Sequence, residues 1–228
     1  SSGNDELFVM DADGSNVQRL TNSKPGSGTV NTDHGWSPDG NWIGFVANGE
    51  LRRIRVDGAS RQTIGRPGHV PSGPPYWAGD DAIYWGASGQ GLFRVPASGG
   101  APTPLTQPRR EAGENNHNSP QMLDDGRTIL FTLTRADGGV PALLNVASGE
   151  WRAIQGVSSN FARYAPSGHL LYRKDEGIFA VTVSLASGTT TGTPQALFDG
   201  VLSGQGVPFA MSADGTLAYL PNSIDTGA

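Results

Sequence analysis

Short apolar and aromatic runs alternate with glycine-containing turns along the whole chain, and the clearest example lies between His34 and Gly65. A first apolar run ends at Trp36, and the Ser-Pro-Asp-Gly sequence after it, which ends at Gly40, has the proline and glycine of a tight turn. Asn-Gly and Asp-Gly pairs then separate three further runs, which predict strands at 42–47, 51–56 and 61–64. The segment therefore predicts four antiparallel strands joined by three tight turns.

The same pattern recurs along the chain with a spacing of about 45 residues, which is typical of repeat folds. The first turn of each copy ends at Gly40, Asp81, Gly126, Gly168 and Gly215. The third turn recurs at Gly14, Gly58, Gly99, Gly149 and Gly188. Five first turns and five third turns predict five four-stranded blades, which is the organisation of a β-propeller.

We therefore predict one all-β domain over 1–228, a five-bladed β-propeller of four-stranded antiparallel blades. Four blades are complete, at 34–65, 74–106, 117–155 and 160–199. The chain begins with a third and a fourth strand, within 4–21, and ends with a first and a second strand, within 207–221. Because an open sheet edge invites aggregation, we expect these two segments to pair into one composite blade that closes the ring. Six blades would allow only about 38 residues each, below the usual length of such a repeat.

The connections from one blade to the next do not repeat. In a propeller they gather at one mouth of the central channel, and irregular loops on a rigid scaffold often carry binding residues. The sequence places these loops at 22–33, 66–73, 107–116, 156–159 and 200–207. The loop mouth is therefore the predicted ligand site.

Composition narrows the range of partners. The 228 residues carry a net charge of −5 with no basic stripe, which argues against nucleic acid and anionic membrane surfaces as partners. No stretch approaches the roughly 20 apolar residues of a membrane span, so no membrane insertion is expected. The absence of cysteine excludes disulfides and thiolate chemistry, but it leaves the compartment open. We expect a monomer.

Three segments carry a family resemblance: LFVMDADGSNVQRLT, HGWSPDGNWIGFV and GLFRVPASGGAPTPLT. They resemble the repeats of the TolB-type, WD-repeat-like β-propellers of bacteria, and the match spans nearly the whole chain. The later blades look most similar to propeller segments associated with bacterial serine/threonine kinases. The resemblance implies an interaction or sensing module in the periplasm or outside the cell. It is specific for the fold and says little about the ligand.

Three of the four histidines, His34, His69 and His117, lie in or beside the predicted inter-blade loops. His34 and His117 take comparable places at the start of successive first strands. Together with Asp33, Glu111 or Glu114, such imidazoles could hold a divalent metal ion at the channel mouth. The alternative is that they only form hydrogen bonds within the channel wall, and we assign no metal site and no cofactor.

Most acidic residues lie in the predicted turns, and none is left on a first strand to form a catalytic carboxylate pair. The aromatic residues Trp36, Trp77 and Tyr164 are expected to pack between blades, whereas Arg163 is unusual as a charged residue within a first strand. No catalytic residue is assigned. The ligand-binding candidates are His34, Tyr76, Glu114, His117, Arg163 and Phe209.

The sequence thus predicts a non-catalytic binding module whose ligand is a protein or peptide segment, or a small molecule, held at the loop mouth. One alternative is a metal-assisted lyase or hydrolase that uses the loop histidines. Another is a structural piece of a larger sensor or kinase-linked protein.

Overall fold

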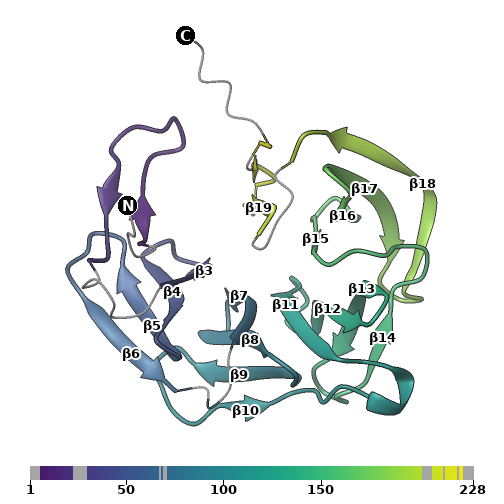
Figure 1. Ribbon diagram of the computed structural model, residues 1–228, viewed down its shortest axis with the longest axis horizontal. Coiled ribbons are helices and arrows are strands. Elements are labelled where there is room, and N and C mark those ends of the chain that lie inside the picture. The colour runs from purple at the N-terminus through teal and green to yellow at the C-terminus, as the bar shows by residue number, and fades with distance from the viewer. Residues whose placement is uncertain are drawn as a thin grey trace.

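The computed structural model describes residues 6–22, 30–66, 68, 71–201, 207–212, 214–219 and 221–222, and the side chains of 30–33 are not described. Four sheets of four antiparallel strands follow one another around a ring (Figure 1). Blade I has the strands β3 (Val30–Trp36), β4 (Trp42–Ala47), β5 (Glu50–Arg55) and β6 (Arg61–Gly65). Blade II has β7 (Pro71–Trp77), β8 (Ala82–Ala87), β9 (Leu92–Pro96) and β10 (Thr103–Pro104).

Blades III and IV repeat this arrangement. Blade III has β11 (Asn116–Met122), β12 (Thr128–Arg135), β13 (Gly138–Asn145) and β14 (Trp151–Ala153), and a short 3₁₀ helix, η1 (Arg110–Ala112), precedes it. Blade IV has β15 (Ala162–Tyr164), β16 (His169–Lys174), β17 (Gly177–Ser184) and β18 (Thr189–Phe198). In the described part of the chain no helix is long and apolar enough to cross a membrane.

The remaining four strands form two hairpins. The N-terminal hairpin has β1 (Phe8–Val9) and β2 (Gln18–Arg19), and the C-terminal hairpin has β19 (Phe209–Met211) and β20 (Leu217–Tyr219). Four complete blades and the four strands of a fifth confirm the five-bladed propeller. In the described residues, however, the two hairpins are separate two-stranded sheets on either side of an opening in the ring, without the backbone pairing that was predicted between them (Figure 1).

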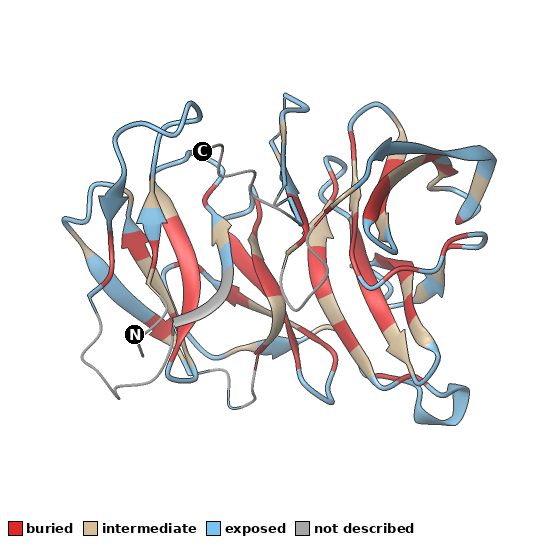
Figure 2. Cartoon of the chain, turned by 45° about the horizontal axis from the view of Figure 1, so that its top comes forward, coloured by how far each residue is buried: buried red, intermediate tan, exposed pale blue. Residues whose placement is uncertain are grey.

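The hydrophobic core lies between neighbouring blades. One apolar cluster fills each of the three boundaries between complete blades. A fourth cluster joins the N-terminal hairpin to blade I, and a fifth joins the C-terminal hairpin to blade IV. The outermost strands β6 and β18 are mostly exposed (Figure 2). Each blade is therefore stabilised chiefly by its neighbours, as expected for a stacked repeat.

Glycines within strands allow this close approach. A Cβ atom on Gly35 would lie 2.3 Å from the Pro75 carbonyl oxygen of blade II, and one on Gly86 would lie 2.3 Å from the His117 carbonyl oxygen of blade III. A clash with backbone atoms cannot be relieved by a change of rotamer, whereas a clash with the end of a flexible side chain can. These strand glycines thus have a packing role that the turn pattern does not predict.

Candidate functional site

The first strand of every blade lies nearest the centre of the ring, so β3, β7, β11, β15 and β19 surround the channel (Figure 1). The residue before the last one in each of these strands occupies an equivalent place, because it pairs with an equivalent residue of the second strand. We call these five residues the channel layer: Gly35, Tyr76, Gln121, Arg163 and Ala210.

Arg163 supplies the positive charge of the channel layer. Its Nη1 donates hydrogen bonds to the carbonyl oxygens of Ser119 and Ala162, both at 3.0 Å, and its guanidinium carbon lies 4.3 Å from the centre of the Phe161 ring. The residue is partly exposed, and surrounding protein atoms lower its pKa to about 10 by desolvation. The guanidinium is therefore charged at neutral pH. No ion pair joins Arg163 to a carboxylate among the described residues.

Tyr76 lies close enough to Arg163 for the two groups to interact electrostatically. Burial raises the pKa of the Tyr76 hydroxyl, while the charge of Arg163 lowers it and that of Asp124 raises it. The hydroxyl therefore stays protonated at neutral pH and can donate a hydrogen bond. The channel layer thus contains a neutral hydrogen-bond donor, the Tyr76 hydroxyl, and a charged one, the Arg163 guanidinium.

Gln121 fixes the strand that lies between Tyr76 and Arg163. Its amide nitrogen donates to the Tyr164 carbonyl oxygen at 3.0 Å, and its amide oxygen accepts from the Tyr164 backbone N–H at 2.8 Å. One side chain therefore satisfies both backbone groups of a residue in the next blade. This bridge holds β11 and β15 together and helps to position Arg163.

The other two members of the layer are small. Gly35 cannot carry a side chain because the Pro75 carbonyl oxygen lies in its way, and Ala210 on β19 is exposed. They are adjacent around the ring, because β19 belongs to the last blade and β3 to the first complete one (Figure 1). The layer therefore has large polar side chains on three strands and almost no side-chain volume on the remaining two.

The channel layer lies at the turn end of the first strands, whereas the sequence placed the ligand site at the loop mouth. Each member precedes the last residue of its strand, and the first turn follows directly. Asp124, whose charge acts on Tyr76, belongs to the first turn of blade III. Tyr76 and Arg163 are thus brought together, but at the end of the channel opposite to the predicted one.

His117 and Glu114 lie away from this layer, in a buried contact between blades II and III. His117 is 0% exposed and Glu114 is 3% exposed. The Nδ1 atom of His117 lies 2.8 Å from the Thr106 hydroxyl, and its Nε2 atom lies 3.2 Å from the Glu114 carboxylate. Thr106 also accepts the Leu92 backbone N–H at 2.8 Å. These contacts stabilise the boundary between blades II and III. His117 and Glu114 are therefore unavailable to a ligand in this form.

The two predicted loop histidines that the structure describes, His34 and His117, do not occupy equivalent positions in their strands. His34 pairs with Phe45, but His117 pairs with Leu133, two positions beyond Phe131, which is the equivalent of Phe45 in blade III. His34 is exposed, and His69 lies outside the described residues, as does the side chain of Asp33. Within the described part of the chain, no three histidine, cysteine, aspartate or glutamate residues are grouped so as to hold a metal ion.

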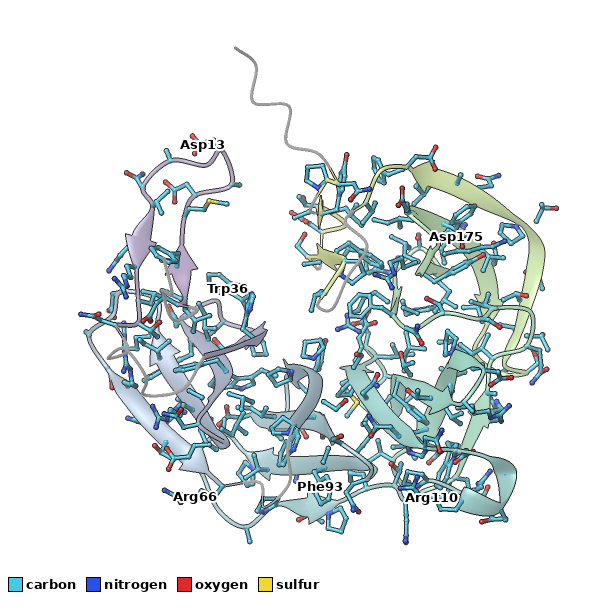
Figure 3. All side chains as sticks on the ribbon, viewed as in Figure 1. Asp13, Trp36, Arg66, Phe93, Arg110 and Asp175 are labelled. Atoms are coloured by element: carbon cyan, nitrogen blue, oxygen red, sulfur yellow. The ribbon has the colours of Figure 1, made fainter. Side chains whose placement is uncertain are left out.

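Two aromatic residues also lie where the sequence did not place them. Phe209 is 1% exposed and packs edge-to-face on Phe161 at 5.2 Å between ring centres, so it belongs to the core. Trp36, expected to pack between blades, is 48% exposed at the inner edge of blade I (Figure 3). Trp77 is buried and Tyr164 packs against the core cluster between blades III and IV.

The channel layer as a set was missed, although the sequence contains a signal for it. Gly35, Tyr76, Gln121, Arg163 and Ala210 each lie five residues before the last residue of the first turn. Aligning the repeats on that turn therefore places them in one column. The differences in side-chain size and charge within this column mark the channel layer in the sequence.

Comparisons with known proteins support the fold. No protein-family model matches the chain, and no curated protein matches it. TolB from Acinetobacter baumannii is similar in structure, with a TM-score of 0.62 and 15% identity over 80% of this chain and 47% of that chain. An oligogalacturonate lyase in complex with manganese has a TM-score of 0.62 and 15% identity over 92% of this chain and 62% of that chain.

The periplasmic gluconolactonase of Pseudomonas aeruginosa has a TM-score of 0.56 and 18% identity over 84% of this chain and 62% of that chain. This chain therefore spans less than two thirds of each of these three proteins. The likeness confirms a TolB-like β-propeller fold, while the closer link to kinase-associated propellers stays a prediction. Propellers of this shape serve different functions in these neighbours, so the function must be argued from the site.

Proposed function

We propose that this protein is a non-catalytic binding module that holds the carboxylate group of its ligand on Arg163 in the channel layer. The ligand is either a protein segment with a free carboxylate or a small organic acid. The observation that carries the proposal is the charged guanidinium of Arg163, which faces no carboxylate among the described side chains. By analogy with TolB and the periplasmic gluconolactonase, we also propose a periplasmic or extracytoplasmic location.

The chemistry of the layer favours an anionic ligand. A guanidinium presents parallel N–H donors that match the two oxygens of a carboxylate. Hydrogen bonds from Nη1 to Ser119 and Ala162 hold the group in place, so a ligand need not order it. Partial desolvation strengthens its attraction for a negative charge, because screening by water is reduced. An anion bound here would neutralise the guanidinium charge, which no carboxylate among the described residues pairs with.

The other layer residues fit the same kind of ligand. The protonated Tyr76 hydroxyl can donate a second hydrogen bond, and the small residues Gly35 and Ala210 contribute little volume beside it. The layer contains no histidine and no carboxylate that could act as general base or acid. Binding without chemical conversion is therefore the activity that the layer supports best.

The test is a binding panel read by ligand-observed NMR on the full chain. One arm uses acetate, pyruvate and gluconate, and the other uses short peptides with a free or an amidated C-terminus. We expect Arg163→Gln to weaken binding of carboxylates by at least tenfold, because the charge is lost. Arg163→Lys should retain part of the affinity, since the charge remains but the paired donors do not.

Arg127→Gln is the matched control, since Arg127 is exposed directly after the first turn of blade III and lies outside the channel layer. It should leave the affinity unchanged. A preference for the free peptides over the amidated ones would identify a protein segment, whereas binding confined to small acids would identify a metabolite-sized ligand. The proposal fails if no carboxylate binds, or if Arg127→Gln weakens binding as much as Arg163→Gln does.

A further inference from the structure

Asp124 carries a carboxylate that the first turn of blade III does not use. The turn is held by Asp125, whose Oδ1 atom accepts the backbone N–H groups of Arg127 and Thr128, both at 2.8 Å. Asp124 is exposed, and its side chain forms no hydrogen bond and no ion pair with any described residue. The formation of the turn therefore does not explain the charge at this position.

The other repeats show that a first turn needs no charge at the position of Asp124. Their residues at this place, two before the last residue of the turn, are Pro38, Gly79, Pro166 and Ala213. The carboxylates that support the turns lie one position later. Asp39 and Asp80, for example, each accept the backbone N–H of the residue two positions further on, at 3.0 and 3.2 Å. The charge of Asp124 is thus particular to blade III.

The turn that contains Asp124 continues directly from the channel layer. Asp124 follows Gln121 by three residues, and Gln121 bridges β11 to β15, the strand that carries Arg163. Burial raises the pKa of the Tyr76 hydroxyl, and of the two charges that act on this group Arg163 lowers the pKa while Asp124 raises it. A positive and a negative side chain therefore both lie within electrostatic range of Tyr76.

These two opposite charges do not neutralise each other through contact. No ion pair joins Arg163 and Asp124, and neither forms an ion pair with another described residue. A ligand with a carboxylate alone would pair with Arg163 but would bring a negative charge toward Asp124, and like charges repel. A ligand that also carries a positive group would meet a complementary charge at both residues.

We propose that the ligand is a small zwitterion with the chemistry of an amino acid, whose carboxylate binds Arg163 and whose protonated amine binds Asp124. This inference rests on the proposed function, because it takes Arg163 as the carboxylate site. The Tyr76 hydroxyl donates a hydrogen bond to the same ligand. Since Asp124 is exposed, its ion pair with the amine stays partly solvated and should change the affinity by about two- to fivefold.

Matched pairs of ligands test the contribution of the amine. Each pair has the same chain length and differs only in a terminal ammonium or methyl group: glycine and propionate, β-alanine and butanoate, 4-aminobutanoate and pentanoate. Dissociation constants are measured at pH 7 by ligand-observed NMR on the full chain. We expect the amino member of at least one pair to bind about two- to fivefold more tightly than its methyl partner.

Variants assign this preference to a residue. Asp124→Asn should abolish the preference for the amine while the affinity for the methyl partner changes by less than about twofold, because the Arg163 site is intact. The control is Asp137→Asn, since Asp137 is exposed in the turn between β12 and β13 of the same blade. This variant should keep the preference. Thermal unfolding of both variants verifies that they are folded.

The outcomes distinguish this inference from the proposed function. If the methyl members bind through Arg163 but no amino member binds more tightly, or if the preference survives Asp124→Asn, the zwitterion proposal is overturned and carboxylate binding by Arg163 stands. If no member of any pair binds, the proposed function itself fails, and the zwitterion proposal fails with it.

Discussion

At the residue scale, His117 shows how a side chain suited to binding can be used for structure. Its ring lies between Phe131 at 4.9 Å and Trp151 at 5.2 Å, while both nitrogens face side-chain oxygens. Glu114 accepts a further bond from the Arg109 backbone N–H at 2.7 Å. Through Thr106, the network ties the loop before blade III to Leu92 at the start of β9, the third strand of blade II. A buried network of this kind stabilises only while all of its members are paired.

Protonation of His117 should therefore weaken the fold. Burial lowers the pKa of His117, aided by the charges of Arg109 and Arg110, while Glu114 opposes the shift. The unfolded chain binds this proton more tightly, so the free energy of unfolding is expected to fall as the pH drops through about 6.5, the pKa of a free histidine, toward the lower folded value. Urea unfolding between pH 7.5 and 5.5 measures this dependence.

Replacing the imidazole separates this effect from that of other groups. His117→Gln should lower the free energy of unfolding at pH 7.5 by about 1–3 kcal/mol, because a buried hydrogen-bond partner is lost, and it should flatten the pH dependence in that range. His169→Gln is the control, since His169 is the half-buried first residue of β16 and its Nδ1 atom lies 3.1 Å from the hydroxyl of Ser167, an exposed turn residue. The interpretation is wrong if both variants keep the wild-type slope.

At the scale of strands, the blade boundaries depend on glycines that let backbones touch. We predict that Gly86→Ala destabilises the protein by more than about 2 kcal/mol, because its Cβ would lie 2.3–2.9 Å from backbone atoms of His117, Asn118 and Ser72. Gly79→Ala in the same blade should change stability by less than about 0.5 kcal/mol, since nothing lies within 4 Å of that position. Equal unfolding midpoints for the two variants would contradict this packing.

The strands and turns themselves could be predicted from the sequence, because they are set by local chemistry. The glycine turns at Gly40 and Gly58 have positive φ values of 69° and 74°, and they end strands where the repeat predicts. The alternation of strands and turns then fixed the blade count. What joins one blade to the next could not be predicted, since it depends on residues distant in the chain, such as Gln121 and Tyr164.

The candidate site was predicted in part for the same reason. Arg163 was singled out as an unusual charged residue of a first strand and Tyr76 was a binding candidate, and the two groups interact electrostatically in the structure. His117 and Phe209 have the same residue chemistry as binding groups, yet the packing of blade on blade buries them. Whether a polar or aromatic side chain faces the channel or the next blade is decided by the fold of the whole ring.

At the scale of the molecule, the propeller acts as a frame that places one residue of each first strand at the same depth in the channel. The repeats differ within this layer: Arg163, Gln121 and Tyr76 have large polar side chains, whereas Gly35 and Ala210 are small. The frame is the same in all blades, so selectivity has to come from these differences. We propose Arg163 as the group that contacts the charge of the ligand.

The most direct measurement is the side-chain Nε–Hε signal of Arg163 in protein-observed ¹⁵N NMR, assigned by its loss in Arg163→Lys. Sodium acetate is added first, and sodium chloride at the same ionic strength serves as the control. We predict that acetate shifts the Arg163 signal in a saturable manner, while chloride does not and the Arg127 signal stays in place. A signal that is unmoved by acetate, or moved equally by chloride, would contradict the assignment of Arg163 as the anion-binding group.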